Sequence, residues 1–109
     1  MLLILIIVLI LGLLLFFNKK GVPCIMYHNV SAEKGITPGE FEEQMMLIQK
    51  YNTFKLEELK NIGNKFPKNT VLVTFDDGYT DNYTNAFPLL KKYNIKATIF
   101  LNTAYINND

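Results

Sequence analysis

An apolar run that ends in two carboxylates constrains the fold of this chain more than any other feature. Val71–Phe75 contains only apolar and β-branched residues, and Asp76, Asp77 and Gly78 follow it directly. A run without polar alternation is typical of a strand that is buried on both faces, as in a parallel sheet. The aspartates then fall at the carboxyl end of that strand, where α/β barrels and open α/β sheets build their active sites.

The same three polar residues also permit a purely structural interpretation. Asp favours tight turns, and Gly supplies the positive φ that such a bend requires. Two adjacent carboxylates can instead divide catalytic work, one as a metal ligand and the other as a proton acceptor. Both interpretations stay open until the rest of the sequence is considered.

Strands and helices are expected to alternate on both sides of this run. The predicted ranges are strands at 22–27, 53–55, 71–75 and 97–101, and helices at 38–51, 56–62 and 82–93. In the first of these helices, Phe41, Met45 and Ile48 have the spacing of one apolar face. Strand–helix–strand order implies parallel pairing through right-handed crossovers. The sequence therefore predicts an α/β fold.

Local signals mark several element ends. Thr37–Glu40 has the form of a capping box, with proline at the first helical position. Asn52 is expected to be a left-handed cap after the helix that precedes it. Pro88 implies that the last helix begins near Asn85 or is kinked in its first turns. Cys24 is expected to be a small buried hydrophobe in the first strand.

Three segments in the same order resemble one enzyme family. Thr74–Tyr79 resembles the first signature motif of the polysaccharide deacetylases, metal-dependent carbohydrate esterases with a chitooligosaccharide-deacetylase homology domain. Pro23–Val30 looks like the first strand of that family, which runs into Tyr-His, and Ile95–Leu101 looks like the strand after its motif helix. The resemblance extends from about Val22 to the last residue. It implies the N-terminal part of a deformed, TIM-like (β/α) barrel, in a domain that covers residues 21–109.

The resemblance also implies roles for single residues. Asp76 corresponds to the general base of the family and Asp77 to a ligand of a divalent metal, with zinc expected. Such a metal polarises the acetamide carbonyl and lowers the pKa of its bound water. His28, Gly78 and Tyr79 are expected beside the catalytic carboxylates or the substrate. For His28 two interpretations stay open, because it can orient a carboxylate or serve as a hydrogen-bonded packing residue.

The implied metal site is incomplete in this sequence. The second motif of the family supplies two histidines four positions apart, whereas this chain contains His28 alone. One carboxylate cannot hold a catalytic zinc, which takes about three protein ligands. Asp81, Asn82 and Tyr83 resemble the continuation of the motif, with helix capping and packing as their expected roles. We therefore expect the first half of a deacetylase, as a truncated, frameshifted or incompletely recorded gene product, that is inactive alone.

The first seventeen residues carry no polar side chain, and Asn18, Lys19 and Lys20 follow them. Such a run is roughly 25 Å long as a helix, the short end of what spans a bilayer. A core helix would show a polar face, and a cleaved signal peptide would show basic residues before the run and a small-x-small site after it. We expect residues 1–20 to form an uncleaved transmembrane anchor, with a cleaved signal as the alternative.

The charge composition limits which binding partners are expected. The net charge is +1 and every basic residue is a lysine, so bidentate recognition of phosphates or base edges is poorly provided for and no nucleic acid is expected. The expected partners are an N-acetylated polysaccharide and the membrane. Lys19 and Lys20 favour a cytoplasmic location for the chain that follows the span. A deacetylase of surface glycan must instead lie outside the cell. We expect a single-pass cell-membrane protein with an extracellular deacetylase part. The alternative from another class is a non-catalytic membrane-anchored protein, either a remnant or an interaction module.

Overall fold

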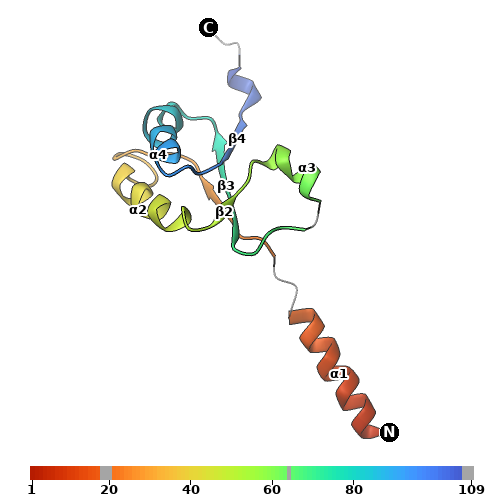
Figure 1. The fold of residues 1–109 in the computed structure, drawn as a ribbon. Coiled ribbons are helices and arrows are strands. Elements are labelled where there is room, and N and C mark those ends of the chain that lie inside the picture. The colour runs from red at the N-terminus through yellow and green to blue at the C-terminus, as the bar shows by residue number, and fades with distance from the viewer. Residues whose placement is uncertain (18–20, 64, 107–109) are drawn as a thin grey trace.

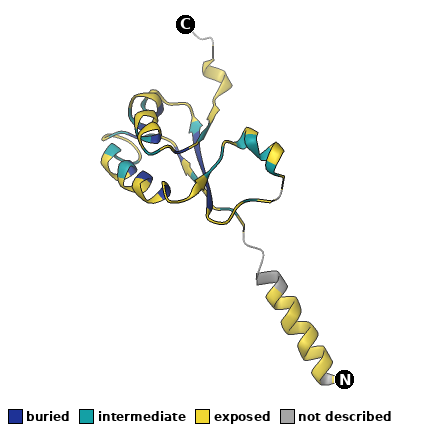
Figure 2. Ribbon diagram, in the orientation of Figure 1, coloured by how far each residue is buried: buried dark blue, intermediate teal, exposed yellow. Residues whose placement is uncertain are grey.

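The computed structural model describes residues 1–17, 21–63 and 65–106, and its first helix lies away from the other elements (Figure 1). This helix, α1 (Leu2–Phe17), has 16 residues, about 24 Å against the roughly 30 Å of a bilayer core. Its described side chains, from Leu3 to Leu14, are all exposed (Figure 2). Within the described residues no helix combines the length and the apolar character needed to cross a membrane, so the predicted transmembrane helix is not found. Residues 18–20 of the predicted anchor lie outside the described residues.

Four parallel strands form the sheet, and the acidic motif lies on the central one. The strands are β1 (Cys24–Tyr27), β2 (Asn52–Thr53), β3 (Thr70–Asp77) and β4 (Thr98–Leu101). β3 pairs with β1 along one edge and with β2 and β4 along the other. The register places Tyr27 beside Phe75 and Leu101 beside Asp77. The parallel α/β arrangement predicted from the sequence is confirmed.

The central strand is buried as its composition predicts. Every residue from Thr70 to Phe75 is buried, which the dark β3 ribbon in Figure 2 shows. Neighbouring strands on both edges exclude water from the backbone of β3, and Val71, Val73 and Phe75 pack into the hydrophobic core on one of its faces. The strand continues through Asp76 and Asp77, so both aspartates belong to its last residues and precede the turn.

Helical segments connect the strands. They are α2 (Pro38–Ile48), η1 (Leu56–Glu58), α3 (Leu59–Ile62), η2 (Asn82–Ala86), α4 (Phe87–Lys92) and η3 (Thr103–Tyr105). Phe41, Met45 and Ile48 of α2 are buried, as predicted. The rings of Tyr27, Phe41 and Phe75 pack together with centroids 5.1–5.9 Å apart, which joins α2 to the sheet. Burial of the ring raises the pKa of Tyr27, and its hydroxyl donates to Gln44 of α2.

Two predicted helix boundaries are confirmed. The Thr37 side chain accepts from the backbone N–H of Glu40, and the Glu40 carboxylate accepts from the backbone N–H of Thr37, which completes the capping box. Before α4, residues 82–86 form a π-helical turn. Pro88 lacks the N–H that a regular α-helix would use, so an irregular first turn replaces a continuous α-helix. The regular helix α4 begins at Phe87, two residues after the start predicted near Asn85, and Pro88 lies in its first turn.

Two other local predictions are wrong. Asn94 adopts the left-handed conformation, with φ 53°, but Asn52 does not. Because α2 already ends at Ile48, Asn52 lies in β2, where its Nδ2 donates to the Lys68 carbonyl at 3.0 Å. Cys24 is exposed, although it was expected to be buried.

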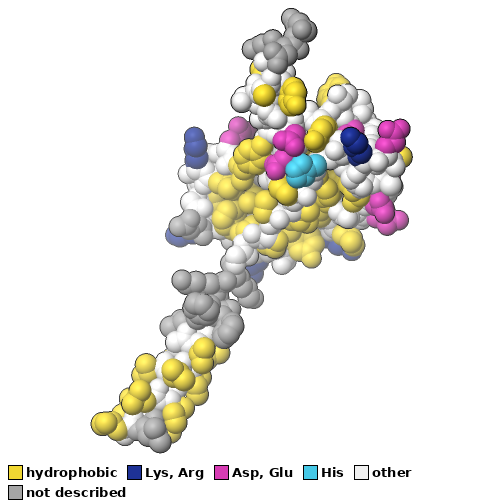
Figure 3. Space-filling model, turned by 180° about the vertical axis from the view of Figure 1, so that it is seen from behind, with side chains coloured by type: hydrophobic (Ala, Val, Ile, Leu, Met, Phe, Trp, Pro, Cys, Tyr) yellow, Lys and Arg dark blue, Asp and Glu magenta, His cyan; other side chains and the backbone are white. Residues whose placement is uncertain are grey.

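The reason for the exposure of Cys24 is the alternation of side chains along β1. Ile25 and Tyr27 pack against the core, so Cys24 and Met26 point to the other face of the sheet. Met26 is 56% exposed. A broad area of hydrophobic side chains lies beside and below the histidine in Figure 3. The described part of the chain therefore covers one face of the sheet better than the other.

Candidate active site

The pairing of β1 with β3 brings His28 to the two aspartates. Because Tyr27 lies beside Phe75, His28, which directly follows β1, comes level with Asp76 near the carboxyl end of β3. His28 Nε2 lies 3.9 Å from Asp76 Oδ2 and 4.0 Å from Asp77 Oδ2. The histidine lies next to acidic side chains on the surface in Figure 3. The structure thus brings together three residues that the sequence predicted for the site.

This cluster is open to solvent. The side chains of His28, Asp76 and Asp77 are 48%, 34% and 44% exposed. Within the described part of the chain, the carboxylates of Asp76 and Asp77 accept no hydrogen bond. Their contact with the imidazole of His28 is at 3.9–4.0 Å. Their oxygens are therefore free to accept a proton or to bind a ligand, and a neighbouring imidazole suits general acid–base chemistry.

The backbone turns sharply at the two residues that end the motif. Asp77 has φ 74° and Gly78 has φ 67°, so two successive residues adopt the left-handed region. A Cβ on Gly78 would lie 2.6 Å from Leu101 Cδ2, so β4 approaches the turn closely. Gly78 is required for its positive φ, whereas Asp77 adopts its positive φ at some conformational cost. The sequence did not predict the strained conformation of Asp77.

Polar residues after the motif hold the loop that follows β1. Asp81 accepts from Asn29 Nδ2 at 2.9 Å and from the Val30 N–H at 3.0 Å. Buried Asn82 donates from Nδ2 to the His28 carbonyl at 2.7 Å. These residues act structurally, as predicted, but Asp81 makes no side-chain cap to the helix. Instead they fix the backbone that carries His28.

Tyr83, the third residue of this segment, packs on the surface. Its ring stacks on Phe87 with a centroid distance of 5.9 Å, and it is 74% exposed. The packing role that the sequence predicted for Tyr83 is observed on the outside of the fold. It contributes no group to the carboxylate cluster.

A cavity of about 380 Å³ opens beside the cluster. Its lining residues are Asp77, Gly78, Tyr79, Thr80, Asn102 and Tyr105. Tyr79 was predicted near the substrate and does line this space. Asn102 and Tyr105 were missed, although both follow a strand whose carboxyl end meets the same edge. That position after β4 is the signal that would have identified them.

The described donors do not complete a metal site. Imidazole nitrogen and carboxylate oxygen are ligand types that zinc accepts. The described residues nevertheless contain no group of three or more His, Cys, Asp or Glu side chains that could hold one ion. The cluster fits part of a zinc site and no more.

Comparison with known sequences identifies the same family along much of the chain. A family model described as polysaccharide deacetylase matches residues 63–109. A Bacillus subtilis protein named as a polysaccharide deacetylase, YxkH, is 44% identical over 86 residues, which cover 72% of this chain and 31% of the relative. The poly-β-1,6-N-acetyl-D-glucosamine N-deacetylase of Staphylococcus epidermidis is 40% identical over 78 residues, covering 67% and 27%.

Solved structures extend the similarity to the fold. The Streptococcus pyogenes deacetylase PplD, solved with acetate, matches with a TM-score of 0.65 and 34% identity, covering 73% of this chain and 42% of that one. IcaB from Ammonifex degensii matches with a TM-score of 0.63 and 31% identity, covering 76% and 39%. The α/β fold is thus similar to that of (β/α)-barrel deacetylases, although this chain spans only about a third of the length of its curated relatives. Over the residues compared, the chain is similar to the polysaccharide deacetylase family, because the family model, the curated relatives and the solved structures all match it.

Proposed function

We propose that this chain supplies the proton acceptor and one metal ligand of a metal-dependent polysaccharide deacetylase. The observation that carries the proposal is the meeting of His28, Asp76 and Asp77 within 4.0 Å at the carboxyl edge of the central strand. The substrate would be a glycan that contains N-acetylglucosamine. One relative is named for the N-deacetylation of such a polymer, which supports this choice.

Each residue of the cluster has a separate role in the proposal. Asp76 accepts a proton as water attacks the acetamide, and Asp77 offers its carboxylate to a divalent metal, with zinc preferred. The metal, when bound, polarises the acetamide carbonyl and lowers the pKa of a bound water. At 3.9 Å from Asp76, His28 is beyond direct hydrogen-bond distance, so it orients that carboxylate through one bridging water. Tyr79 and Tyr105 line the space in which the glycan would lie.

The remaining metal ligands would have to come from residues outside the described part of this chain. Asp77 is the one residue of the chain that matches a metal ligand of the family, and zinc requires about three. The uncovered face of the sheet around Met26 and the open edge of β4 offer surface for such polypeptide. We therefore propose that the 109 residues alone do not turn over substrate.

The test is acetate release from an N-acetylglucosamine oligomer in the presence of zinc or cobalt. The chain would be assayed alone and after fusion to the carboxyl-terminal part of a homologous deacetylase domain. We expect no turnover from the chain alone and chelator-sensitive turnover from the fusion. Turnover by the chain alone would refute its incompleteness, and an inactive but folded fusion would favour the alternative of a non-catalytic interaction module.

Variants of the fusion then separate the two carboxylates. Asp76→Asn should abolish turnover while the metal stays bound, because only the proton acceptor is lost. Asp77→Asn should weaken metal binding itself. Glu43→Gln, an exposed carboxylate on α2, is the matched control and should change neither. Equal metal loss in both aspartate variants would contradict the division of roles.

We also propose that α1 attaches the protein to a cell membrane, with the deacetylase part on the extracellular side, where surface glycan lies. The proposal is supported by the exposed apolar side chains from Leu3 to Leu14. With a C-terminal tag, the chain should stay in the membrane fraction after carbonate washing and keep its full mass. Release of a product shorter by about two dozen residues would favour a cleaved signal peptide instead.

A further inference from the structure

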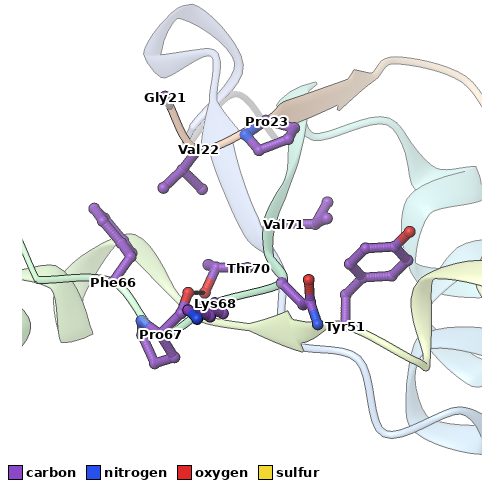
Figure 4. Close-up of a pocket in the computed structure, with 10 residues that line it drawn as sticks. Gly21, Val22, Pro23, Tyr51, Phe66, Pro67, Lys68, Thr70 and Val71 are labelled. Carbon is purple, nitrogen blue, oxygen red and sulfur yellow. Dashed lines mark hydrogen bonds between the residues drawn. The ribbon is translucent and has the colours of Figure 1, made fainter. Parts of the chain in front are cut away.

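A second cavity lies at the edge of the sheet opposite to the carboxylates. Its volume is about 510 Å³, and segments that precede β1, β2 and β3 line it. Val22, Pro23, Phe66 and Pro67 lie around the start of β3 in Figure 4. Because the strands are parallel, the edge where they begin is the edge farthest from the acidic motif.

The segments around this cavity are basic. Lys68 lines the cavity, and Lys50 and Lys65 are the sequence neighbours of two lining aromatic residues, Tyr51 and Phe66. All three lysines are exposed, and none forms an ion pair within the described residues. The described residues of 49–52 and 63–70 include no Asp or Glu. The segments that line this cavity therefore carry unpaired lysines next to two aromatic rings.

Backbone contacts hold these segments side by side. The Asn52 N–H donates to the Asn69 carbonyl at 2.8 Å, and Asn52 Nδ2 donates to the Lys68 carbonyl at 3.0 Å. Thr70 Oγ1 donates to the Pro67 carbonyl at 2.7 Å and fixes the turn into β3. The lysines thus project from a constrained part of the fold.

Charge differs between the two edges of the sheet. Asp76, Asp77 and Asp81 lie at the carboxyl edge, and acidic side chains gather around the histidine in the upper part of Figure 3. Lysine side chains appear along the lower margin of the domain in the same view, towards α1. Lysines also appear in the upper part of this view, but the described segments that precede β2 and β3 carry lysines without any Asp or Glu, whereas three aspartates lie at the carboxyl edge.

The cavity is also close to the apolar helix along the chain. Gly21, the first described residue after α1, lines the cavity. Phe17 ends α1, and the four residue steps from Phe17 to Gly21 can span at most about 14 Å. Any surface that holds the end of α1 is consequently within reach of the basic edge.

We propose that this surface, which we call the basal face and define by Lys50, Tyr51, Lys65, Phe66 and Lys68, docks on an anionic lipid surface. The proposal rests on the membrane attachment of α1 proposed above and adds a second contact. Lysines near an anionic bilayer strengthen binding about fivefold each, and the ring of Tyr51, which carries a hydroxyl, suits the headgroup region. Docking in this way turns the carboxylate edge away from the lipid and towards glycan.

Vesicle partitioning of the full chain tests the charge contribution. Phosphatidylcholine vesicles with and without phosphatidylglycerol are compared for the parent chain and for Lys65→Glu/Lys68→Glu. The double variant should bind the anionic vesicles at least about tenfold more weakly and the neutral vesicles equally well. Lys34→Glu/Lys60→Glu changes the same charge at exposed lysines elsewhere and should lose less than about twofold. Equal losses in the two double variants, or no preference of the parent for anionic lipid, would overturn the proposal.

The neutral vesicles separate this proposal from the attachment of α1. Binding to anionic vesicles that depends on Lys65 and Lys68, without any binding to neutral vesicles, would support the basal face and contradict apolar attachment by α1. Equal binding of the parent and the double variant to both kinds of vesicle would support attachment by α1 and contradict the basal face. Absence of all binding would overturn both proposals.

A fluorescence experiment tests the orientation. The chain contains no tryptophan, so Phe66→Trp creates a single reporter on the basal face. Tyr105→Trp, beside Asp77 at the opposite edge, is the matched control. With anionic vesicles, Phe66→Trp emission should shift to the blue and be quenched by brominated lipid, while Tyr105→Trp should remain unquenched. Equal quenching of both reporters, or quenching of Tyr105→Trp alone, would overturn the orientation.

Discussion

Asp81 and the pair Asp76–Asp77 lie at the same edge of the sheet, but the surrounding protein uses their carboxylates differently. Asp81 is half-buried and accepts hydrogen bonds from Asn29, Val30 and Asn82. Asp76 and Asp77 face solvent and the His28 ring at about 4 Å. Only the three residues 78–80 thus separate a carboxylate that holds the fold together from carboxylates that the fold leaves free.

The difference shows how one short acidic segment can carry both stability and chemistry. A carboxylate that is saturated with protein donors stabilises a loop but has little capacity left to accept a proton or bind a ligand. A carboxylate without such donors adds little stability and keeps that capacity. Substitutions in the two groups should therefore separate unfolding free energy from activity.

The largest expected effect on stability is that of Asp81→Ala. This variant leaves the Val30 N–H and the Asn29 amide without their charged acceptor, and we expect the free energy of unfolding to fall by about 3 kcal/mol. Urea unfolding followed by circular dichroism measures the change. Asp76→Asn, which removes a carboxylate charge without breaking such contacts, should stay within about 0.5 kcal/mol. Equal losses of unfolding free energy in both variants would contradict the distinction between Asp81 and the pair Asp76–Asp77.

The next effect is expected at the turn between the two groups. Gly78→Ala places a Cβ at φ 67° and against Leu101, and should lower the unfolding free energy by about 1–2 kcal/mol. The close atom, Cδ2, is at the end of a flexible side chain. Adding Leu101→Ala should therefore leave most of the loss from Gly78→Ala in place, as a double-mutant cycle would show. Full recovery would mean that the contact, and not the backbone angle, requires glycine.

A smaller effect of opposite sign is expected at Asp77. Because its φ of 74° suits glycine, Asp77→Gly should raise the unfolding free energy by about 0.5 kcal/mol while it removes the proposed metal ligand. Asp76→Gly introduces the same residue within the strand at a site without positive φ, and should lower it by about 0.5–1 kcal/mol. Denaturant midpoints of the two variants on opposite sides of the parent would confirm that Asp77 is strained. Destabilisation by both would show that it is not.

The smallest effect concerns a surface carboxylate that resembles Asp81 in having partners. Glu42 Oε1 accepts from Lys92 Nζ and from the Tyr93 hydroxyl, each at 2.7 Å, and these hydrogen bonds lower the pKa of Glu42 below its ordinary value of 4.5. The resulting stabilisation is present above that ordinary value and is lost as pH falls through the lowered pKa. Glu42→Gln should therefore flatten the decline of Tm below about pH 4.5, whereas Glu43→Gln should leave it in place. An unchanged pH profile for Glu42→Gln would show that these surface contacts add nothing.

Elements with local signals could be predicted from the sequence. The capping box at Thr37 and the apolar face of α2 lie within one helix, and the run of β3 identifies a buried strand by itself. The position of the aspartates followed from the order of the elements. His28 could be placed beside them because parallel strands end at the same edge.

Contacts between distant segments could not be predicted in this way. Asp81 meets Asn29 and Val30 across more than 50 residues, and nothing in either segment indicates the other. The exposure of Cys24 was missed because alternation defines two faces of a strand without saying which one is covered. The positive φ of Asp77 occurs where β3 pairs with β4, a strand more than 20 residues further along the chain, so local sequence signals did not indicate it.

The direct pairing of β1 with β3 makes the fold unequally tolerant of changes in chain length. In the sheet, the long connection that contains β2, η1 and α3 does not lie between β1 and β3, the strands that position His28 and the aspartates. Doubling the length of such a loop costs only about 0.6 kcal/mol in closure entropy. One residue added within Cys24–Tyr27 would instead shift the register and turn His28 to the other face of the sheet. Homologues should therefore vary in length between α2 and β3 far more readily than in the few residues before the histidine.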